Sequence, residues 1–244
     1  SEGRQNRGGQ GISGAGVSRV RSIFLPRGIP MKIQAIASIV VLMASFSLFT
    51  ACQDPAKGKP KAAVGAAEQA TSQSLGKIEQ LQLKAGESTV GFVGSKVTGA
   101  HPGTFQEFSG AIQLSDGKAE GGSVTVDIEM SSVNTGLEKL DGHLKSADFF
   151  DVAKYPKAQF VSTNVKLGGE KGATHTLAGN LSLHGVTKSI SFPATINVGP
   201  EWVTATSEFS INRKDFSIVY PGMPNDLIRD EVLIKLNLKV KRAK

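Results

Sequence analysis

The chain has 244 residues, of which 39% are hydrophobic and 20% are charged. This composition excludes a polytopic membrane protein and a wholly disordered chain. The formal net charge is +7, but residues 1–51 hold six basic side chains against one acid, so they carry five of the seven charges. The rest of the chain is nearly neutral, and the sequence therefore predicts no nucleic-acid partner.

Residues 1–30 are rich in Gly and Arg and show no hydrophobic period. We interpret them as a non-native or over-extended segment before a start at Met31. The alternative is a basic arm that contacts nucleic acid. We favour the first interpretation because an exported domain would leave such an arm behind.

Met31 and Lys32 are followed by an apolar run that ends in small residues at Ala51. This pattern predicts a secretory signal peptide over residues 31–51. The run ends in Leu-Phe-Thr-Ala-Cys, which resembles a bacterial lipobox with Phe49 in the place where Leu is usual. We therefore expect lipidation at Cys52, the only cysteine, and an exported lipoprotein facing the periplasm, with Gln53 favouring the outer membrane. An uncleaved transmembrane anchor and plain secretion are the alternatives.

Residues 52–80 are rich in Ala, Lys, Gly and Ser and show no apolar period. They are interpreted as the lipidated cysteine followed by a flexible linker, with a helix over 62–70 as the alternative. The folded domain is expected over residues 81–244.

Beyond residue 80, apolar and polar residues alternate, most clearly over 124–130, 190–198, 203–211 and 232–240. Glycine-containing turn signals separate these runs. Eight or more such strands predict an antiparallel sandwich or a closed barrel. In the run 158–167, Ala158 and Phe160 share one phase, whereas Val161 and Val165 share the other, so the sequence leaves the inner face open.

One segment has helical spacing instead. Leu137, Leu140 and Leu144 predict an amphipathic helix within Thr135–Ala147 that would cover one end of the barrel. Thr135 and Glu138 have the spacing of a capping box at its start.

Four segments now point to a family: residues 103–110, 143–156, 177–188 and 211–217. The stretch HLKSADFFDVAKYP at 143–156 is the most specific of them. Their order and spacing resemble the YceI-like polyisoprenoid-binding family over about residues 85–242. The resemblance implies an all-β, eight-stranded antiparallel lipocalin-like barrel with one helix that holds an isoprenoid chain. It also implies a protein that is not an enzyme. Residues 97–103 and 220–229 depart from the family pattern.

The expected ligand is an isoprenoid lipid or an isoprenoid quinone, bound for storage, transport or protection, with no further cofactor. The candidates for the cavity wall are apolar residues, and ordinary core packing is the alternative for each: Phe92, Phe105, Phe108, Val126, Ile128, Phe149, Phe150, Phe160, Phe192, Trp202, Phe209 and Phe216. His143 and Arg213 are candidates for contact with a polar head group. The alternatives for them are a structural histidine and a surface charge opposite Asp215.

Other function classes receive little support. The four histidines are scattered without the spacing of a metal site, so no metal is expected. Ser182, His184 and Asp215 could be assembled into a hydrolytic set, but no nucleophile-elbow motif accompanies them. A barrel with a solid core that acts as an interaction module is the main alternative, and a homodimer is left open.

Overall fold

The computed structural model describes residues 54–69 and 76–242. Residues 1–30, the signal peptide predicted over 31–51, and Cys52 lie outside this range. Within the described residues, the structure contains no helix with the length and hydropathy needed to cross a membrane.

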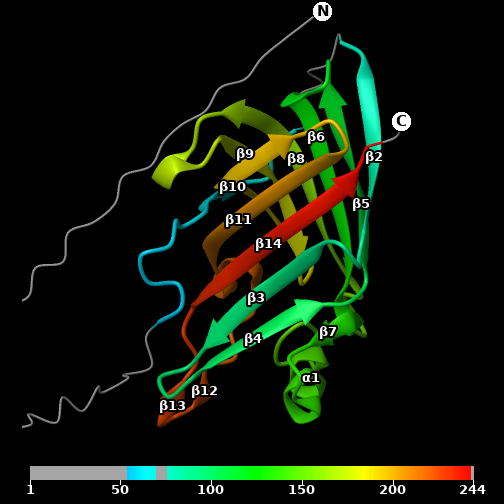
Figure 1. Cartoon of the computed structure of the whole chain (residues 1–244). Helices are drawn as coiled ribbons and strands as arrows, with labels where there is room; N and C mark the ends of the chain where they lie inside the picture. Colours follow the sequence, from blue (N-terminus) through cyan, green and yellow to red (C-terminus); the bar gives the residue numbers. More distant parts are fainter. Residues whose placement is uncertain (1–53, 70–75, 243–244) are drawn as a thin grey trace, which may run out of the picture. The chain divides into compact units, whose positions relative to one another are not determined.

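Most of the described chain forms one antiparallel sheet that curls into a half-barrel (Figure 1). The spatial order is β2-β5-β6-β8-β9-β10-β11-β14-β3-β4-β7. The strands are β2 (Ile78–Lys84), β3 (Thr89–Ser95), β4 (Ala100–Phe105), β5 (Phe108–Ser115), β6 (Lys118–Glu129), β7 (Val133–Asn134), β8 (Lys157–Leu167), β9 (His175–Leu183), β10 (Val186–Val198), β11 (Trp202–Asn212) and β14 (Glu231–Lys241). In addition, β1 (Ala63–Ala66) pairs with β10, and β12 (Gly222–Met223) pairs with β13 (Asp226–Leu227). The predicted all-β antiparallel barrel class with one helix is confirmed.

The strands outnumber the eight predicted, partly because two long segments of chain bend. Only Gln106 and Glu107 separate β4 from β5, and a 3-10 turn over Met130–Ser132 separates β6 from β7. The two bends bond to each other, since Gln106 N donates to the Ser132 carbonyl and Glu129 N donates to the Glu107 carbonyl. The sheet therefore turns its corner here without losing its backbone pairing.

A β-bulge resolves the phase of β8. Its register with β9 shifts between Ser162 and Asn164, where one strand has an extra residue. Ala158 and Phe160 line the interior before the bulge, and Val165 lines the interior after it. Because a bulge moves the following residues to the other phase, Val165 joins Ala158 and Phe160 on the inner face, whereas Val161, which precedes the bulge, lines neither cavity.

The helix α1 (Glu138–Lys145) is shorter than predicted, and the predicted capping box is wrong. The N-cap is Leu137, with no side-chain cap. Thr135 instead donates from both its N and its Oγ1 to Asp141 Oδ1, at 2.7 Å each. Leu144 is buried, whereas Leu137 is 54% exposed, so the helix presents a narrower apolar face than the leucine spacing predicted.

The structure contradicts the flexible-linker prediction for part of the segment 52–80. Residues 63–66 form β1, which pairs in register with residues 188–191 of β10, and Ala62 is buried. The alternative helix is also wrong. Small side chains without a period carry no strand signal of their own, and here the pairing with the sheet decides the structure.

A two-point ion pair joins β2 to the residue after β14. Arg242 Nε lies 2.9 Å from Glu79 Oε1, and Nη2 lies 2.5 Å from Oε2. This hydrogen bonding holds the pKa of Glu79 below its ordinary value. A carboxylate with a lowered folded-state pKa contributes stability above its unfolded-state pKa, and that contribution disappears as the pH falls through the folded-state value.

We therefore expect Glu79→Gln to lower the urea midpoint modestly at pH 7 and to have a smaller effect near pH 3. Urea unfolding of the two proteins at both pH values measures this. An equal difference between the proteins at pH 7 and pH 3 would contradict the assignment.

Candidate ligand cavity

The inner face of the half-barrel encloses a cavity of about 210 Å³. Its wall is built from the inward phases of the strands and from Leu144 of α1. Every lining side chain is apolar except Arg213. Nine of the predicted cavity residues lie in this wall: Phe92, Phe105, Val126, Ile128, Phe149, Phe150, Phe160, Phe192 and Phe209.

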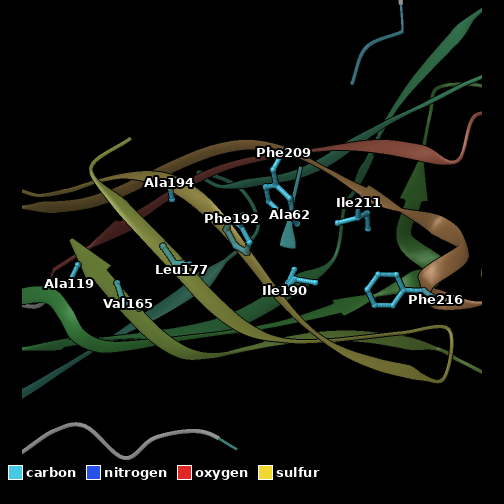
Figure 2. Packing of buried hydrophobic residues seen from close by; sticks show 10 residues of the cluster. All are labelled: Ala62, Ala119, Val165, Leu177, Ile190, Phe192, Ala194, Phe209, Ile211 and Phe216. Carbon is cyan, nitrogen blue, oxygen red and sulfur yellow. The ribbon is translucent and has the colours of Figure 1, made fainter. Parts of the chain in front are cut away.

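Aromatic rings gather in two groups around the cavity. Near α1, the ring centroids of Phe92, Phe105 and Phe150 lie 5.6 to 6.4 Å apart. Phe192 stacks on Phe209 with centroids 4.1 Å apart and planes 8° apart, and both belong to the buried cluster drawn in Figure 2. A smaller cavity of about 40 Å³ also has Phe192 in its wall. The interior thus holds a main chamber and, beside it, a smaller cavity that shares part of its wall.

Three predicted aromatic residues lie outside the cavity wall. Phe108 is buried in a separate cluster with Leu81 and Leu114, and Phe216 is fully buried in the cluster of Figure 2. Trp202 is on the outer phase of β11, where the Lys239 ammonium lies 4.2 Å from its ring centroid. All three are better explained by packing, or for Trp202 by a cation–π contact, than by contact with a ligand.

His143 is also not part of the cavity wall. Its Nε2 lies 2.9 Å from Asp148 Oδ2, and its ring meets the edges of Phe149 and Tyr220 with centroids 5.0 and 5.2 Å away. Phe149 lines the cavity and His143 does not. The sequence predicted that His143 contacts a head group. In the structure it instead packs against Phe149 and supports the position of that ring.

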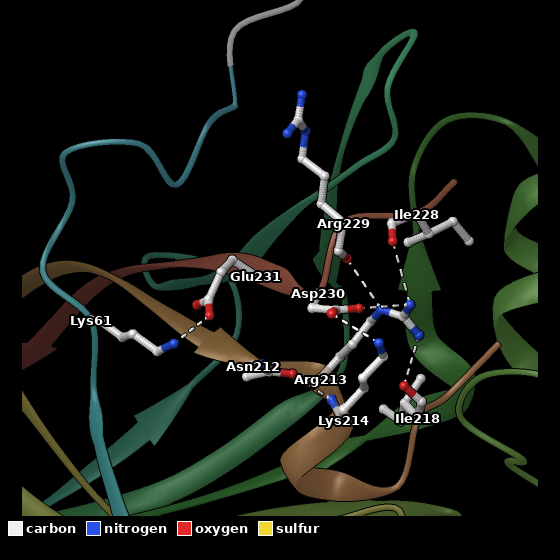
Figure 3. Close-up of polar contacts among 9 residues, drawn as sticks. All are labelled: Lys61, Asn212, Arg213, Lys214, Ile218, Ile228, Arg229, Asp230 and Glu231. Atoms are coloured by element: carbon white, nitrogen blue, oxygen red, sulfur yellow. Dashed lines mark hydrogen bonds and ion pairs between the residues drawn. The ribbon is translucent and has the colours of Figure 1, made fainter. Parts of the chain in front are cut away.

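Arg213 reaches the cavity wall, but each of its three side-chain nitrogens already has a partner (Figure 3). Its side chain is buried. Nη1 donates to the Ile218 carbonyl at 2.7 Å, Nε donates to the Arg229 carbonyl at 3.2 Å, and Nη2 contacts Asp230 Oδ1 at 3.2 Å. Burial lowers the pKa of Arg213, and Asp230 opposes that shift. The expected surface pairing with Asp215 is wrong, because the partner is Asp230 and the side chain is inside.

Sequence reasoning named mostly aromatic residues and missed the aliphatic part of the wall. That part includes Leu181, Leu183, Ile190, Ile211, Ile218, Ile228, Val232, Ile234 and Leu236. The alternation of apolar and polar residues in β10, β11 and β14 could have identified Ile190, Ile211 and Ile234 as part of the wall. Ile218 and Ile228 come from the loops around β12 and β13 and follow no strand period.

The chemistry of this wall is suited to retaining an apolar chain. It offers shape and hydrophobic contact but only one polar side chain, each of whose nitrogens already has a protein partner. Ser182 and His184, considered above for hydrolysis, have separate partners. Ser182 Oγ lies 2.8 Å from Thr187 Oγ1, and His184 Nδ1 lies 3.2 Å from the Phe216 carbonyl.

Comparison with known proteins identifies the family. The family model of the YceI-like domain matches residues 81–240. The chain belongs to the YceI-like family. A UPF0312 protein of Pseudomonas putida strain W619 is 38% identical over 139 residues, which cover 54% of this chain and 71% of that protein. The YceI-like domain boundaries agree with the start of the barrel in β2 and its end in β14.

Solved structures share the same fold. BcnA of Burkholderia cenocepacia matches with a TM-score of 0.56 and 25% identity, covering 62% of this chain and 95% of that one. A polyisoprenoid binding domain of Saccharophagus degradans matches with a TM-score of 0.54 and 21% identity, covering 68% of this chain and 100% of that one. The YceI-like domain here therefore adopts the family's β architecture.

Proposed function

We propose that the protein binds a long apolar isoprenoid, either a polyprenyl lipid or an isoprenoid quinone, in the cavity of its half-barrel. The observation that carries the proposal is a cavity of about 210 Å³ whose wall is apolar except for Arg213. Members of the YceI-like family are binding proteins, and the Saccharophagus degradans relative is described as a polyisoprenoid binding domain. Storage, transport and protection of the ligand are the roles that fit such a protein.

Energetics support an occupied cavity. At about 24 cal/mol per Å³, an empty space of this volume costs on the order of 5 kcal/mol of stability. An apolar chain recovers roughly 0.8 kcal/mol for each buried methylene-sized unit. Retention of the cavity favours a ligand-binding protein over an interaction module with a solid core.

Organic extraction of the protein purified from a bacterial envelope tests the proposal, with mass spectrometry of the extract and native mass spectrometry of the complex. We expect a stoichiometric, chloroform-soluble molecule whose mass fits a series of isoprene units. Repeated recovery of the protein without any apolar molecule would contradict the proposed function.

We also propose that the protein is exported and held at the membrane through a lipid on Cys52, facing the periplasm. The apolar run of residues 31–51 and the residues before Cys52 support this location. A single acyl chain binds a membrane only marginally, whereas the several chains of a lipoprotein anchor it stably.

Cys52→Ala tests the anchor. We expect the variant to leave the membrane fraction, because the thiol is the site of lipid attachment. Fractionation of envelopes followed by immunoblotting measures the distribution, with Ser45→Ala in the preceding apolar run as a matched control that keeps the thiol. Unchanged membrane retention of Cys52→Ala would indicate an uncleaved helix instead.

A further inference from the structure

The wall of the half-barrel has a seam between two consecutive strands. β10 and β11 pair directly only over Thr195–Val198 and Val203–Thr206. Earlier in β10 its ladder is with β9, and later in β11 the ladder is with β14. The facing edges of β10 and β11 therefore diverge, leaving backbone donors and acceptors that need other partners.

The N-terminal segment Lys59–Glu68, called here the strap, occupies this seam. Its residues 63–66 pair with residues 188–191 of β10. On the other side, Ala62 N donates to the Ser210 carbonyl at 2.9 Å, and Ser210 N donates to the Pro60 carbonyl at 2.8 Å. The strap thus bonds to both edges and completes the wall.

The strap lies directly behind residues of the ligand cavity. Ala62 is 3% exposed and belongs to the same buried cluster as Phe192 and Phe209 (Figure 2). Those two rings line the cavity and stack on each other, one from β10 and one from β11. The inner side of the seam is therefore closed by this aromatic pair and its outer side by the strap.

The strap is held mainly by backbone bonds and solvent-facing polar contacts. Lys59 pairs with Glu208, Lys61 lies 2.5 Å from Glu231 (Figure 3), and Glu68 exchanges two backbone-to-amide hydrogen bonds with Asn180. Exposed ion pairs contribute little to stability. Of the strap side chains, Ala62 alone is fully buried. A segment with so little buried apolar surface opens at lower free energy than the ladders around it.

We propose that the seam between β10 and β11 is a lateral portal through which an apolar chain enters the cavity, and that the strap is its removable cover. The inference rests on the proposed function, because it needs the ligand to occupy this cavity. Six residues lie between Cys52 and Lys59, so an extended chain spans at most about 25 Å between them. If Cys52 carries the lipid, the portal is kept close to the membrane in which apolar ligands dissolve.

A disulfide that ties the strap to the β10 edge of the seam tests the portal. Ala63 and Ser191 are cross-strand partners, and this spacing suits a disulfide. The full chain carries Cys52→Ala together with Ala63→Cys and Ser191→Cys. The matched control locks the neighbouring ladder between β8 and β9, away from the strap, through Gln159→Cys and Ser182→Cys, which are cross-strand partners. The probe is diphenylhexatriene, an elongated hydrocarbon that fluoresces in apolar surroundings.

We expect oxidation of the seam pair to slow probe entry by about tenfold or more, with unchanged affinity and recovery on reduction. Oxidation of the control pair leaves the entry rate unchanged. Equal entry rates for the oxidised and reduced seam variant would overturn the portal while leaving the proposed function intact. Absence of saturable probe binding in the unmodified protein would overturn the proposed function and the portal together.

Hydrogen exchange gives a second readout that needs no ligand. We expect the amides of Ala62 and Ser210 to exchange about tenfold or more faster than those of the β11–β14 ladder. Equal protection of the strap and of that ladder would show that the cover does not open separately, and would overturn the proposal.

Discussion

The variant Ile234→Trp is expected to bind diphenylhexatriene at least about 100-fold more weakly than the wild type, a loss of about 2.7 kcal/mol. Ile234 lies in β14, opposite Phe209 of β11 and Phe92 of β3, and its side chain lines the main chamber. An indole ring at this position occupies the volume that the ligand needs. Because the ring fills existing space, we expect the fold to survive with a stability change of no more than about 1–3 kcal/mol.

Fluorescence titration measures the affinity, and urea unfolding confirms that the variant is folded. The matched control is Lys235→Trp, which adds the same ring one residue later on the exposed face of the same strand. The control is expected to bind the probe like the wild type. Tight binding by a folded Ile234→Trp protein would place the ligand elsewhere and contradict the cavity as its site.

Much of the cavity wall followed from the sequence because a strand has a period of two. Once one residue of β10, β11 or β14 is placed inside, alternate residues along that strand must follow it. This is why the inward positions of Phe192 and Phe209 agree with the alternating pattern. The resemblance of residues 143–156 to the family placed Phe149 and Phe150 beside the barrel, which no periodicity could have done.

Other features depended on pairing between distant segments. The bulge in β8 changes the phase of one strand in the middle, and only its register with β9 reveals where. The strap has small side chains without a period, so its strand exists because β10 and β11 offer it open edges. The burial of Arg213 depends on carbonyl groups of residues 218, 228 and 229, whose positions come from the β12–β13 region. Apart from Ile218, which is five residues from Arg213, these partners lie far away in the sequence.

Arg213→Met is expected to lower the free energy of unfolding by about 3 kcal/mol, because it leaves buried carbonyl acceptors without donors. The guanidinium bonds the carbonyl groups of Ile218 and Arg229 and pairs with Asp230, so it ties the segment after β11 to the segment before β14. Methionine retains much of the side-chain length but none of the donors. Arg213→Lys retains the charge but not the planar fork, so we expect it to recover only a small part of the loss.

Urea unfolding at pH 7 measures these differences, and Lys214→Met is the matched control. Lys214 also pairs with Asp230, at 2.9 Å, but its side chain is 49% exposed. The loss expected for the control is therefore below about 1 kcal/mol. If Arg213→Met and Lys214→Met were equally stable, the buried guanidinium would not brace this end of the cavity. The contrast tests a structural role for Arg213 that is distinct from the head-group contact expected from its charge alone.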